Sequence, residues 1–268
     1  MKKLNFVTTI QARMTSTRLP GKTLKKFKSS NSKYNNLTSL EILINRIKNS
    51  KFVTDIIIAT STNKKDDKIE SFCNDKQISC YRGNEFDVLG RLVEALQNQK
   101  HKHVIQLTAD NPFLDPEIIN YIVETYIKEY PKFDFVTNNG LMKPGYREIP
   151  FGMDVSVFSA QKLIDCASLT EEGVFREHPT LYFYTNNNDA FSTLNVPTPE
   201  CWKRKEKSIR LTFDTDKDFQ FLQAIYSHFT QKDNKFSLED ILNFLDKNEK
   251  LIKINSKINQ KIPITKKT

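Results

Sequence analysis

The stretch that decides the fold is an apolar run followed by a basic loop, Leu4-Asn5-Phe6-Val7-Thr8-Thr9-Ile10-Gln11-Ala12-Arg13-Met14-Thr15-Ser16-Thr17-Arg18-Leu19-Pro20-Gly21-Lys22. The run from Leu4 to Ile10 is typical of a β-strand, so the loop lies at the carboxyl end of the first strand. Its three cations (Arg13, Arg18 and Lys22) alternate with small or hydroxyl-bearing residues, which let backbone N–H groups approach a polyanion. The loop follows neither the P-loop pattern nor the glycine pattern of dinucleotide-binding proteins. The residues alone therefore leave two interpretations open, a phosphate-binding loop and a basic surface loop.

Beyond this loop, expected helices and strands alternate. Helices are expected around 39–47, 66–75, 88–96 and 116–126, and strands around 52–60, 78–81, 103–108 and 133–137. This alternation predicts an α/β fold, a mostly parallel twisted sheet with helices on both faces. Ligands of such sheets bind beyond the carboxyl ends of the strands, where the basic loop, Thr60-Ser61 and Asp110 fall.

The alternation of strands and helices ends over residues 138–202, where Gly and Pro interrupt the chain. Strands are expected there at 153–158 and 181–185. We interpret 138–202 as an insertion with antiparallel character. A strand over 208–213 and helices over 219–229 and 238–245 then complete one domain, residues 1–245. Residues 246–268 hold seven lysines and two acids, which predicts a last helical turn and a flexible basic tail.

The composition excludes several classes of protein. The net charge is +9, but the tail supplies about half of it and no aromatic-plus-basic nucleic-acid motif appears, so we expect no nucleic-acid partner. No run approaches the roughly 20 apolar residues of a membrane span, and the amino-terminal run is too short and polar for a signal peptide, so we expect a cytoplasmic protein without a membrane partner. The four cysteines are widely spaced and are expected to be free thiols: Cys73, Cys80, Cys166 and Cys201.

Acidic residues follow two of the expected strands. Asp110 follows the strand at 103–108, and Asp214 and Asp216 follow the strand at 208–213. An Asp after a strand is often a helix N-cap, so a structural role stays open for each, and Asp115 before Pro116 is the expected N-cap of its helix.

Several motifs resemble those of one enzyme family. The basic loop resembles the opening signature of the CMP-KDO and CMP-sialate synthetase superfamily of cytidylyltransferases, and is closest to its SpsF-like spore-coat polysaccharide branch. Thr15 stands where that branch usually has Gly. The segment 108–116 resembles the family's metal-binding segment with Ala109 in place of Gly, and 210–219 resembles a later acidic segment with Asp216 where Pro is frequent.

The resemblance implies a Rossmann-like nucleotide-diphospho-sugar transferase fold, with an inserted acceptor and dimerisation region. It also implies Mg²⁺ bound by Asp110, Asp214 and Asp216, and catalytic roles for Arg13, Lys22, Asp110 and Asp214. The nucleotide-binding positions that it implies are Gln11, Ala12, Arg13, Thr15, Ser16, Arg18, Lys22, Thr60, Ser61, Asp87, Arg91 and Thr108. For Asp87 and Arg91 the alternative is a capped helix start with a surface i,i+4 pair.

The acceptor-binding positions that match the family are Asp154, Arg176, Glu177 and His178. A structural ion pair of Arg176 with Glu177 or Asp154 is the alternative. Arg147 is a further cation near this pocket by position alone, and the run around Trp202 to Lys205 is interpreted as solvated surface.

The predicted function is CTP-dependent transfer of CMP to an acidic sugar or another small anionic or phosphorylated acceptor, with release of pyrophosphate, in surface-glycan biosynthesis. A homodimer is expected. The alternatives are a nucleotidyltransferase that uses another NTP, and a catalytically silent nucleotide-sugar binding subunit.

Overall fold

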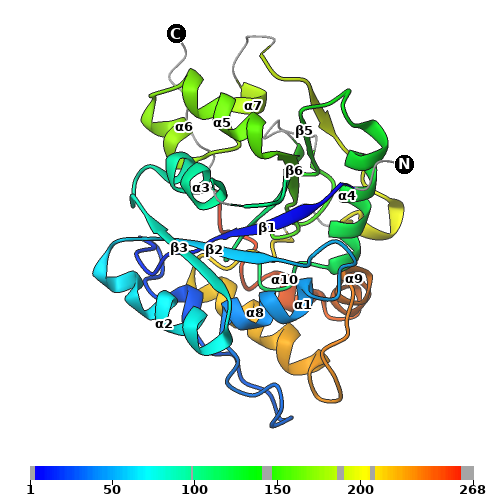
Figure 1. Ribbon diagram of the computed structural model, residues 1–268. Coiled ribbons are helices and arrows are strands. Elements are labelled where there is room, and N and C mark those ends of the chain that lie inside the picture. The colour runs from blue at the N-terminus through cyan, green and yellow to red at the C-terminus, as the bar shows by residue number, and fades with distance from the viewer. Residues whose placement is uncertain (1–3, 98, 141–146, 186–189, 206–208, 261–268) are drawn as a thin grey trace.

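A computed structural model describes residues 4–97, 99–140, 147–185, 190–205 and 209–260 (Figure 1). Its centre is a seven-stranded sheet in the order β3-β2-β1-β4-β6-β5-β7. The strands are β1 Phe6–Gln11, β2 Ile56–Ser61, β3 Ser79–Gly83, β4 His103–Thr108, β5 Phe135–Thr137, β6 Ser156–Ser159 and β7 Thr193–Asn195. The first four are parallel, and β6 pairs antiparallel with both β4 and β5. The predicted fold class is confirmed.

Helices cover both faces of the sheet (Figure 1), so the central strands β1 and β4 are buried on both sides. One face carries α1 Ser39–Ile47, α2 Asp67–Lys76, α4 Pro116–Glu129, α8 Asp216–Phe229 and α9 Leu238–Asp246. The other carries α3 Val88–Leu96, α5 Ala160–Leu169, α6 Gly173–Glu177 and α7 Tyr182–Thr185. Each face holds its own hydrophobic cluster.

Side-chain caps fix where the helices start. The Asp115 carboxylate accepts a hydrogen bond from the backbone N–H of Glu117, as predicted, and Thr215 forms a capping box with Asp218 at the start of α8. Both caps lie directly after loops at the carboxyl ends of strands or extended segments, so they also fix the path of those loops.

Two of the expected strands are wrong. Residues 182–185 form helix α7, because the Phe183 ring stacks on Phe135 at 4.8 Å between ring centroids and a helical turn presents it there. A strand is also expected over 208–213, but its described residues, 209–213, form none. Arg210 makes a single β-bridge to Phe151. Leu211 N donates to Phe151 O and Phe213 N donates to Asp110 O, and these bonds hold the segment in place. Ser208 lies outside the described residues.

The carboxyl-terminal segment contains the expected last helical turn, but up to residue 260 it differs from the expected flexible tail. Residues Glu249–Ile252 form α10, Ile252 is buried, and the buried Asn255 amide donates to the Arg210 carbonyl and to the Asp218 carboxylate. Residues 246–260 therefore belong to the folded body, and residues 261–268 lie outside the described part.

Two expectations about the chain as a whole can be compared with the structure. All four cysteines are free thiols, as predicted. Within the described ranges, the structure contains no helix with the length and apolar character needed to cross a membrane.

Candidate active site

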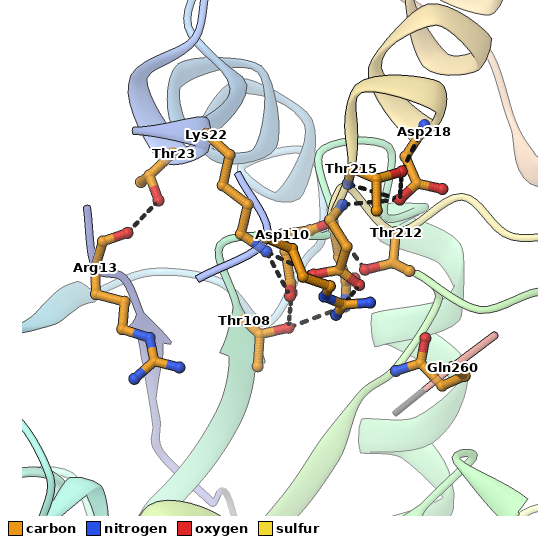
Figure 2. A network of polar contacts seen from close by, with 12 residues as sticks. Arg13, Lys22, Thr23, Thr108, Asp110, Thr212, Thr215, Asp218 and Gln260 are labelled. Carbon is orange, nitrogen blue, oxygen red and sulfur yellow. Dashed lines mark hydrogen bonds and ion pairs between the residues drawn. The ribbon is translucent and has the colours of Figure 1, made fainter. Parts of the chain in front are cut away.

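The basic loop after β1 is closed on itself by its own backbone. Gly21 adopts φ 77°, a left-handed conformation that suits glycine, and its N–H donates to the Met14 carbonyl at 2.9 Å. The Thr23 hydroxyl donates to the Arg13 carbonyl at 2.8 Å (Figure 2). The Pro-Gly corner thus turns the chain so that Lys22 begins a short 3₁₀ helix, Lys22–Leu24, facing back toward β4.

Asp66 anchors this loop from the short 3₁₀ helix Lys64–Asp66, which follows β2, and sequence reasoning missed it. Its fully buried carboxylate accepts from Met14 N at 2.7 Å and from both the backbone N–H and the hydroxyl of Ser61. The loop after β1 is therefore fastened to the end of β2. In the sequence Asp66 resembles an ordinary first-turn acid of α2.

Lys22, Asp110 and Asp214 converge from three separate segments. The Lys22 ammonium lies 2.8 Å from Asp214 Oδ1 and 3.2 Å from Asp110 Oδ2 (Figure 2). Asp214 Oδ2 is 2.9 Å from a guanidinium nitrogen of Arg18 and 2.9 Å from one of Arg210. The buried Asp214 carboxylate is thus paired with three cations, two of which also pair with other carboxylates, Lys22 with Asp110 and Arg210 with Asp218.

The electrostatics keep this centre ionised. Burial disfavours the charged form of Asp110, but Lys22 and the Thr108 hydroxyl outweigh it and lower the pKa of Asp110 below its ordinary value of 3.8. Burial likewise opposes the charge on Lys22, yet Asp110 and Asp214 raise the pKa of Lys22 above its ordinary 10.5. The ammonium and the Asp110 carboxylate are both charged at neutral pH.

The pair of aspartates is suited to a hard cation. Carboxylate oxygens are the protein ligands that Mg²⁺ prefers, and the Lys22 ammonium already stands as a cation between the two groups. Within the described residues no cluster of three or more His, Cys, Asp or Glu side chains forms a metal cage, so further ligands would come from phosphate oxygens. Asp216 does not join the pair; its side chain is 71% exposed and its Oδ1 accepts from Lys25 at 2.9 Å.

Arg210 and Asp218 support Asp214 from behind, and sequence reasoning gave neither a role. The buried Arg210 guanidinium donates to Asp218 Oδ1 at 3.0 Å, and through another nitrogen to Gln260 Oε1 at 2.9 Å. Asp218 in turn accepts from the backbone N–H of Asp214. The one available signal is the spacing Thr215-x-x-Asp218, which marks a capping box.

The other expected nucleotide-binding residues of β1, β2 and the basic loop also lie at the edge of the sheet where these parallel strands end. Gln11 is the last residue of β1 and Ala12 follows it. Ser16 is buried in the loop, and the Thr15 hydroxyl donates to Glu85 at 2.7 Å. Thr60, next to the end of β2, has a buried hydroxyl without a hydrogen-bond partner among the described residues. Thr15, in place of the family's usual Gly, thus has a specific partner.

Asp87 and Arg91 both take part in the fold of α3. Asp87 caps the helix by accepting from Gly90 N, and Arg91 is 2% exposed with one guanidinium nitrogen donating to Asn84 O. The capped helix start of the alternative is therefore present, but its surface ion pair is wrong, because Arg91 is buried and Asp87 lies 3.7 Å from Arg176 instead.

A polar cavity of about 220 Å³ opens beside Asp110. Asp154, Glu177 and His178 line it together with Thr108 and Gln11. Burial lowers the pKa of His178, so its imidazole is neutral near pH 7. Three of the four expected acceptor residues are therefore on one cavity wall.

Arg176, the fourth, is not on that wall. Its guanidinium lies 3.7 Å from Asp87 and 3.2 Å from Glu171. The expected ion pairs of Arg176 with Glu177 or Asp154 are wrong: Glu177 is 3.7 Å from Arg13, and Asp154 pairs with Arg147. Figure 2 shows the Arg13 guanidinium turned away from the Lys22 cluster.

The interpretation of Trp202 to Lys205 as solvated surface is also partly wrong. The Trp202 ring packs edge-on against Tyr121, with ring centroids 5.6 Å apart, and Arg204 donates to the Arg147 carbonyl at 3.0 Å. Lys203 forms ordinary surface ion pairs with Glu148 and Glu200, and Lys205 forms one with Asp246.

Comparison with known proteins agrees with this geometry. The cytidylyltransferase family matches residues 7–254. The spore coat polysaccharide biosynthesis protein SpsF of Bacillus subtilis is 31% identical over 244 residues, which cover 89% of this chain and 93% of that protein. A cytidylyltransferase structure from Leptospira borgpetersenii superposes with a TM-score of 0.82 at 28% identity, covering 97% of this chain and 99% of that one.

A more distant structure shares the fold. It is CMP:2-keto-3-deoxy-manno-octonic acid synthetase complexed with CTP, with a TM-score of 0.57 and 15% identity over 84% of this chain and 99% of that chain.

The α/β sheet, the basic loop after β1 and the convergence of Asp110 and Asp214 on Lys22 agree with the class that the family match shows, a nucleotidyltransferase. The chain belongs to the cytidylyltransferase family, and the enzyme class and the resemblance to the SpsF branch predicted from the motifs are confirmed.

Proposed function

We propose that this protein is a CTP-dependent cytidylyltransferase. It transfers CMP to an acidic sugar or another small anionic acceptor, phosphorylated acceptors included, releases pyrophosphate, and serves surface-glycan biosynthesis in the cytoplasm. The observation that carries the proposal is the convergence of Lys22, Asp110 and Asp214 beside a 220 Å³ polar cavity. The polysaccharide role of the SpsF relative and the CTP bound in the synthetase structure support it.

The main barrier to the reaction is electrostatic. The acceptor oxygen approaches a triphosphate with roughly four negative charges, and two like charges 4 Å apart repel by about 4 kcal/mol at an effective dielectric constant of 20. Arg18 and Lys22 face this centre, so the β- and γ-phosphates would replace carboxylates as their partners. The loop N–H groups complete the phosphate cradle.

The chemistry is a single displacement. The acceptor hydroxyl forms a bond to the α-phosphorus, the bond from that phosphorus to the pyrophosphate oxygen breaks, and the hydroxyl proton is lost to a base or to water. The described residues supply position and charge, and no covalent intermediate is needed. Gln11 and Thr108 line the cavity at the point where it meets Asp110, which is where the acceptor hydroxyl would lie.

A divalent cation fits the two aspartates. Asp110 and Asp214 would hold Mg²⁺ together with phosphate oxygens, and the ion would neutralise charge on the α-phosphate and the leaving pyrophosphate. Asp216 could join only by leaving its ion pair with Lys25.

We assign the recognition of cytosine to polar groups near the ends of β1 and β2 and the start of α3, among them Thr60 and Arg91. The buried Thr60 hydroxyl is without a partner among the described residues, and Arg91 Nε is likewise buried and unpaired there. Buried polar groups of this kind are commonly satisfied by a ligand or water.

An assay of pyrophosphate release tests the proposal. Each of the four common NTPs is supplied with Mg²⁺ and with one acceptor at a time, either an acidic sugar or a phosphorylated compound. Preference for CTP with one acceptor supports it. Preference for another NTP would establish the rival nucleotidyltransferase, and binding of CTP without any turnover would refute transfer.

We also propose a homodimer. Helix α5, within the 138–202 region, exposes two large apolar side chains, Ile164 (41% exposed) and Leu169 (51% exposed), which a second subunit could cover. Light scattering on the purified protein tests this, and a mass of 31 kDa, that of a single chain, would refute it.

A further inference from the structure

The guanidinium of Arg210 lies deeper in the protein than the other two cations that pair with Asp214. Its side chain is 3% exposed, and its Nη2 lies 2.9 Å from Asp214 Oδ2. Its Nε donates to Asp218 Oδ1 at 3.0 Å. The side chains of Arg18 and Lys22 are 26% and 11% exposed. A ligand can therefore draw Arg18 and Lys22 away from Asp214 more readily than Arg210.

This difference in burial matters once a nucleotide binds. In the proposed reaction Arg18 and Lys22 turn to the triphosphate, while Arg210 stays in place. Three carboxylates and one guanidinium then remain together: Asp110, Asp214, Asp218 and Arg210. Their net charge of −2 matches one divalent cation. Asp214 would then depend on Arg210 alone among its three cations for the direction of its carboxylate.

Two amides of the carboxyl-terminal segment hold Arg210. Gln260 Oε1 accepts from Nη1 of Arg210 at 2.9 Å, and Gln260 also lines the cavity beside Asp110. The buried Asn255 amide donates to the Arg210 carbonyl at 3.1 Å and to Asp218 Oδ1 at 2.9 Å. All three guanidinium nitrogens of Arg210 thus have an acceptor, which fixes the plane of the group.

The segment that carries these amides reaches the site through the fold. Both residues follow residue 254, where the match to the cytidylyltransferase family ends, so the family pattern alone does not place them there. The buried Ile252 side chain at the end of α10 anchors the segment on the folded body. Residues 255–260 therefore form part of the reaction centre in three dimensions.

We propose that Arg210 is a positioning residue for Asp214, and that Gln260 and Asn255 fix Arg210 in that role. This inference rests on the proposed function. Arg210 holds Asp214 Oδ2, so Oδ1, which pairs with Lys22 in the absence of nucleotide, stays available for a divalent cation. Loss of the Gln260 oxygen leaves one buried N–H of Arg210 without its acceptor and lets the guanidinium turn. Such a change weakens the hold on the cation and leaves the phosphate contacts of Arg18 and Lys22 unchanged.

Binding of CTP to the full chain, without an acceptor so that no turnover occurs, tests the assignment. Titration calorimetry gives the dissociation constant of CTP in EDTA and in excess Mg²⁺, and their ratio is the factor by which Mg²⁺ strengthens binding. Mg²⁺ also binds free CTP, but equally in every experiment, so differences between variants report the protein site.

Each variant has its own expected ratio. Arg210→Lys should lower the ratio roughly 10- to 100-fold, the usual loss when a group that supports a metal ligand is removed. Gln260→Ala acts one bond further away and should lower it about 3- to 10-fold. The affinity for CTP in EDTA should not change in either variant. A purely structural role would weaken CTP binding equally in both conditions and leave the ratio as it is.

Asn259→Ala is the matched control. Asn259 is the residue before Gln260, carries an amide of the same kind and is exposed, so its loss should leave the ratio unchanged. Urea unfolding checks that each variant is folded. Should Arg210→Lys fail to fold, Gln260→Ala still decides, because the Gln260 side chain is only half-buried.

Two results would overturn the assignment: an unchanged ratio in the folded Gln260→Ala variant, or an equal fall in Gln260→Ala and Asn259→Ala. Either result with a wild type that releases pyrophosphate from CTP would refute the roles of Arg210 and Gln260 and leave the transferase intact. A wild type that neither binds CTP nor releases pyrophosphate would refute the proposed function, and this inference with it.

Discussion

Asp66→Asn is expected to destabilise the protein and loosen the phosphate loop. The carboxylate accepts three hydrogen bonds in a fully buried position, one from Met14 N and two from Ser61. An amide keeps one acceptor oxygen and turns an NH₂ group toward the other donors. The Ser61 hydroxyl can rotate to accept, but one buried backbone N–H stays unpaired whichever way the amide is oriented.

The magnitude follows from these contacts. One unpaired buried N–H costs about 1–3 kcal/mol, and replacing a charged acceptor by a neutral one weakens the surviving bond by roughly 1 kcal/mol. The free energy of unfolding should therefore fall by about 2–4 kcal/mol, a large share of the roughly 5–15 kcal/mol of a typical domain. The KM for CTP should rise as well, because Met14 lies inside the loop to which we assign the phosphates.

Asp67→Asn is the matched control. Asp67 is the next residue, its side chain is 56% exposed, and it pairs with Arg82 at the surface, so its loss should cost less than about 1 kcal/mol. Urea unfolding followed by circular dichroism compares the two variants. Equal stability of the Asp66 and Asp67 variants would refute the anchoring role of Asp66.

The remaining predictions concern the reaction centre and one glycine. Asp110→Asn should lower the turnover rate at least about a thousandfold while the circular dichroism spectrum is unchanged. Asp216→Asn should keep a turnover rate within roughly tenfold of the wild type. Comparable losses of pyrophosphate release in both variants would contradict the separation of Asp216 from the Lys22, Asp110 and Asp214 cluster. The difference in free energy of unfolding between the wild type and Lys22→Met should be constant between about pH 5 and 10. Because the pKa of Asp110 is lowered on folding, its contribution to stability is complete above pH 3.8 and is lost as the pH falls through the folded pKa. Because the pKa of Lys22 is raised on folding, its contribution is complete below pH 10.5 and is lost as the pH rises through the folded pKa. Urea titrations across pH check this, and a difference that grows toward acid pH would oppose it. Gly152→Ala should destabilise by about 2–5 kcal/mol, because φ is 99° and the new Cβ would lie 2.5 Å from the Leu211 carbonyl carbon, while Gly173→Ala, with open space around it, should be neutral or slightly stabilising in thermal melts.

The sequence predicts the parallel half of the sheet well, for a physical reason. Strands such as Ile56–Ser61 and His103–Thr108 are buried on both faces, so they appear as continuous apolar runs, and the carboxyl ends of parallel strands meet at one edge. That shared edge is why Lys22 and Asp110 could be expected to lie together although 88 residues separate them.

The insertion is less predictable, because tertiary packing decides it. Tyr182–Thr185 is rich in aromatic residues that favour strands, yet the buried ring of Phe183 requires a helical turn there. Arg147 lines the cavity and Arg176, in α6, does not. That difference depends on how distant parts of the chain pack together, and residue spacing in the sequence does not predict it. Asn255 resembles a tail residue, and only its fixed partners Arg210 and Asp218 make it part of the core.

The contact between Thr15 and Glu85 has a consequence for how the nucleotide is received. Glu85 also accepts from Asn63 at 2.8 Å, so a chain of side chains connects the segments that follow β1, β2 and β3. A glycine at position 15 would have no side chain to hold the loop after β1, whereas the Thr15 hydroxyl fixes this loop by its hydrogen bond to Glu85. In the proposed reaction, a triphosphate would bind to a loop whose shape is already fixed, so less conformational entropy would be lost on binding.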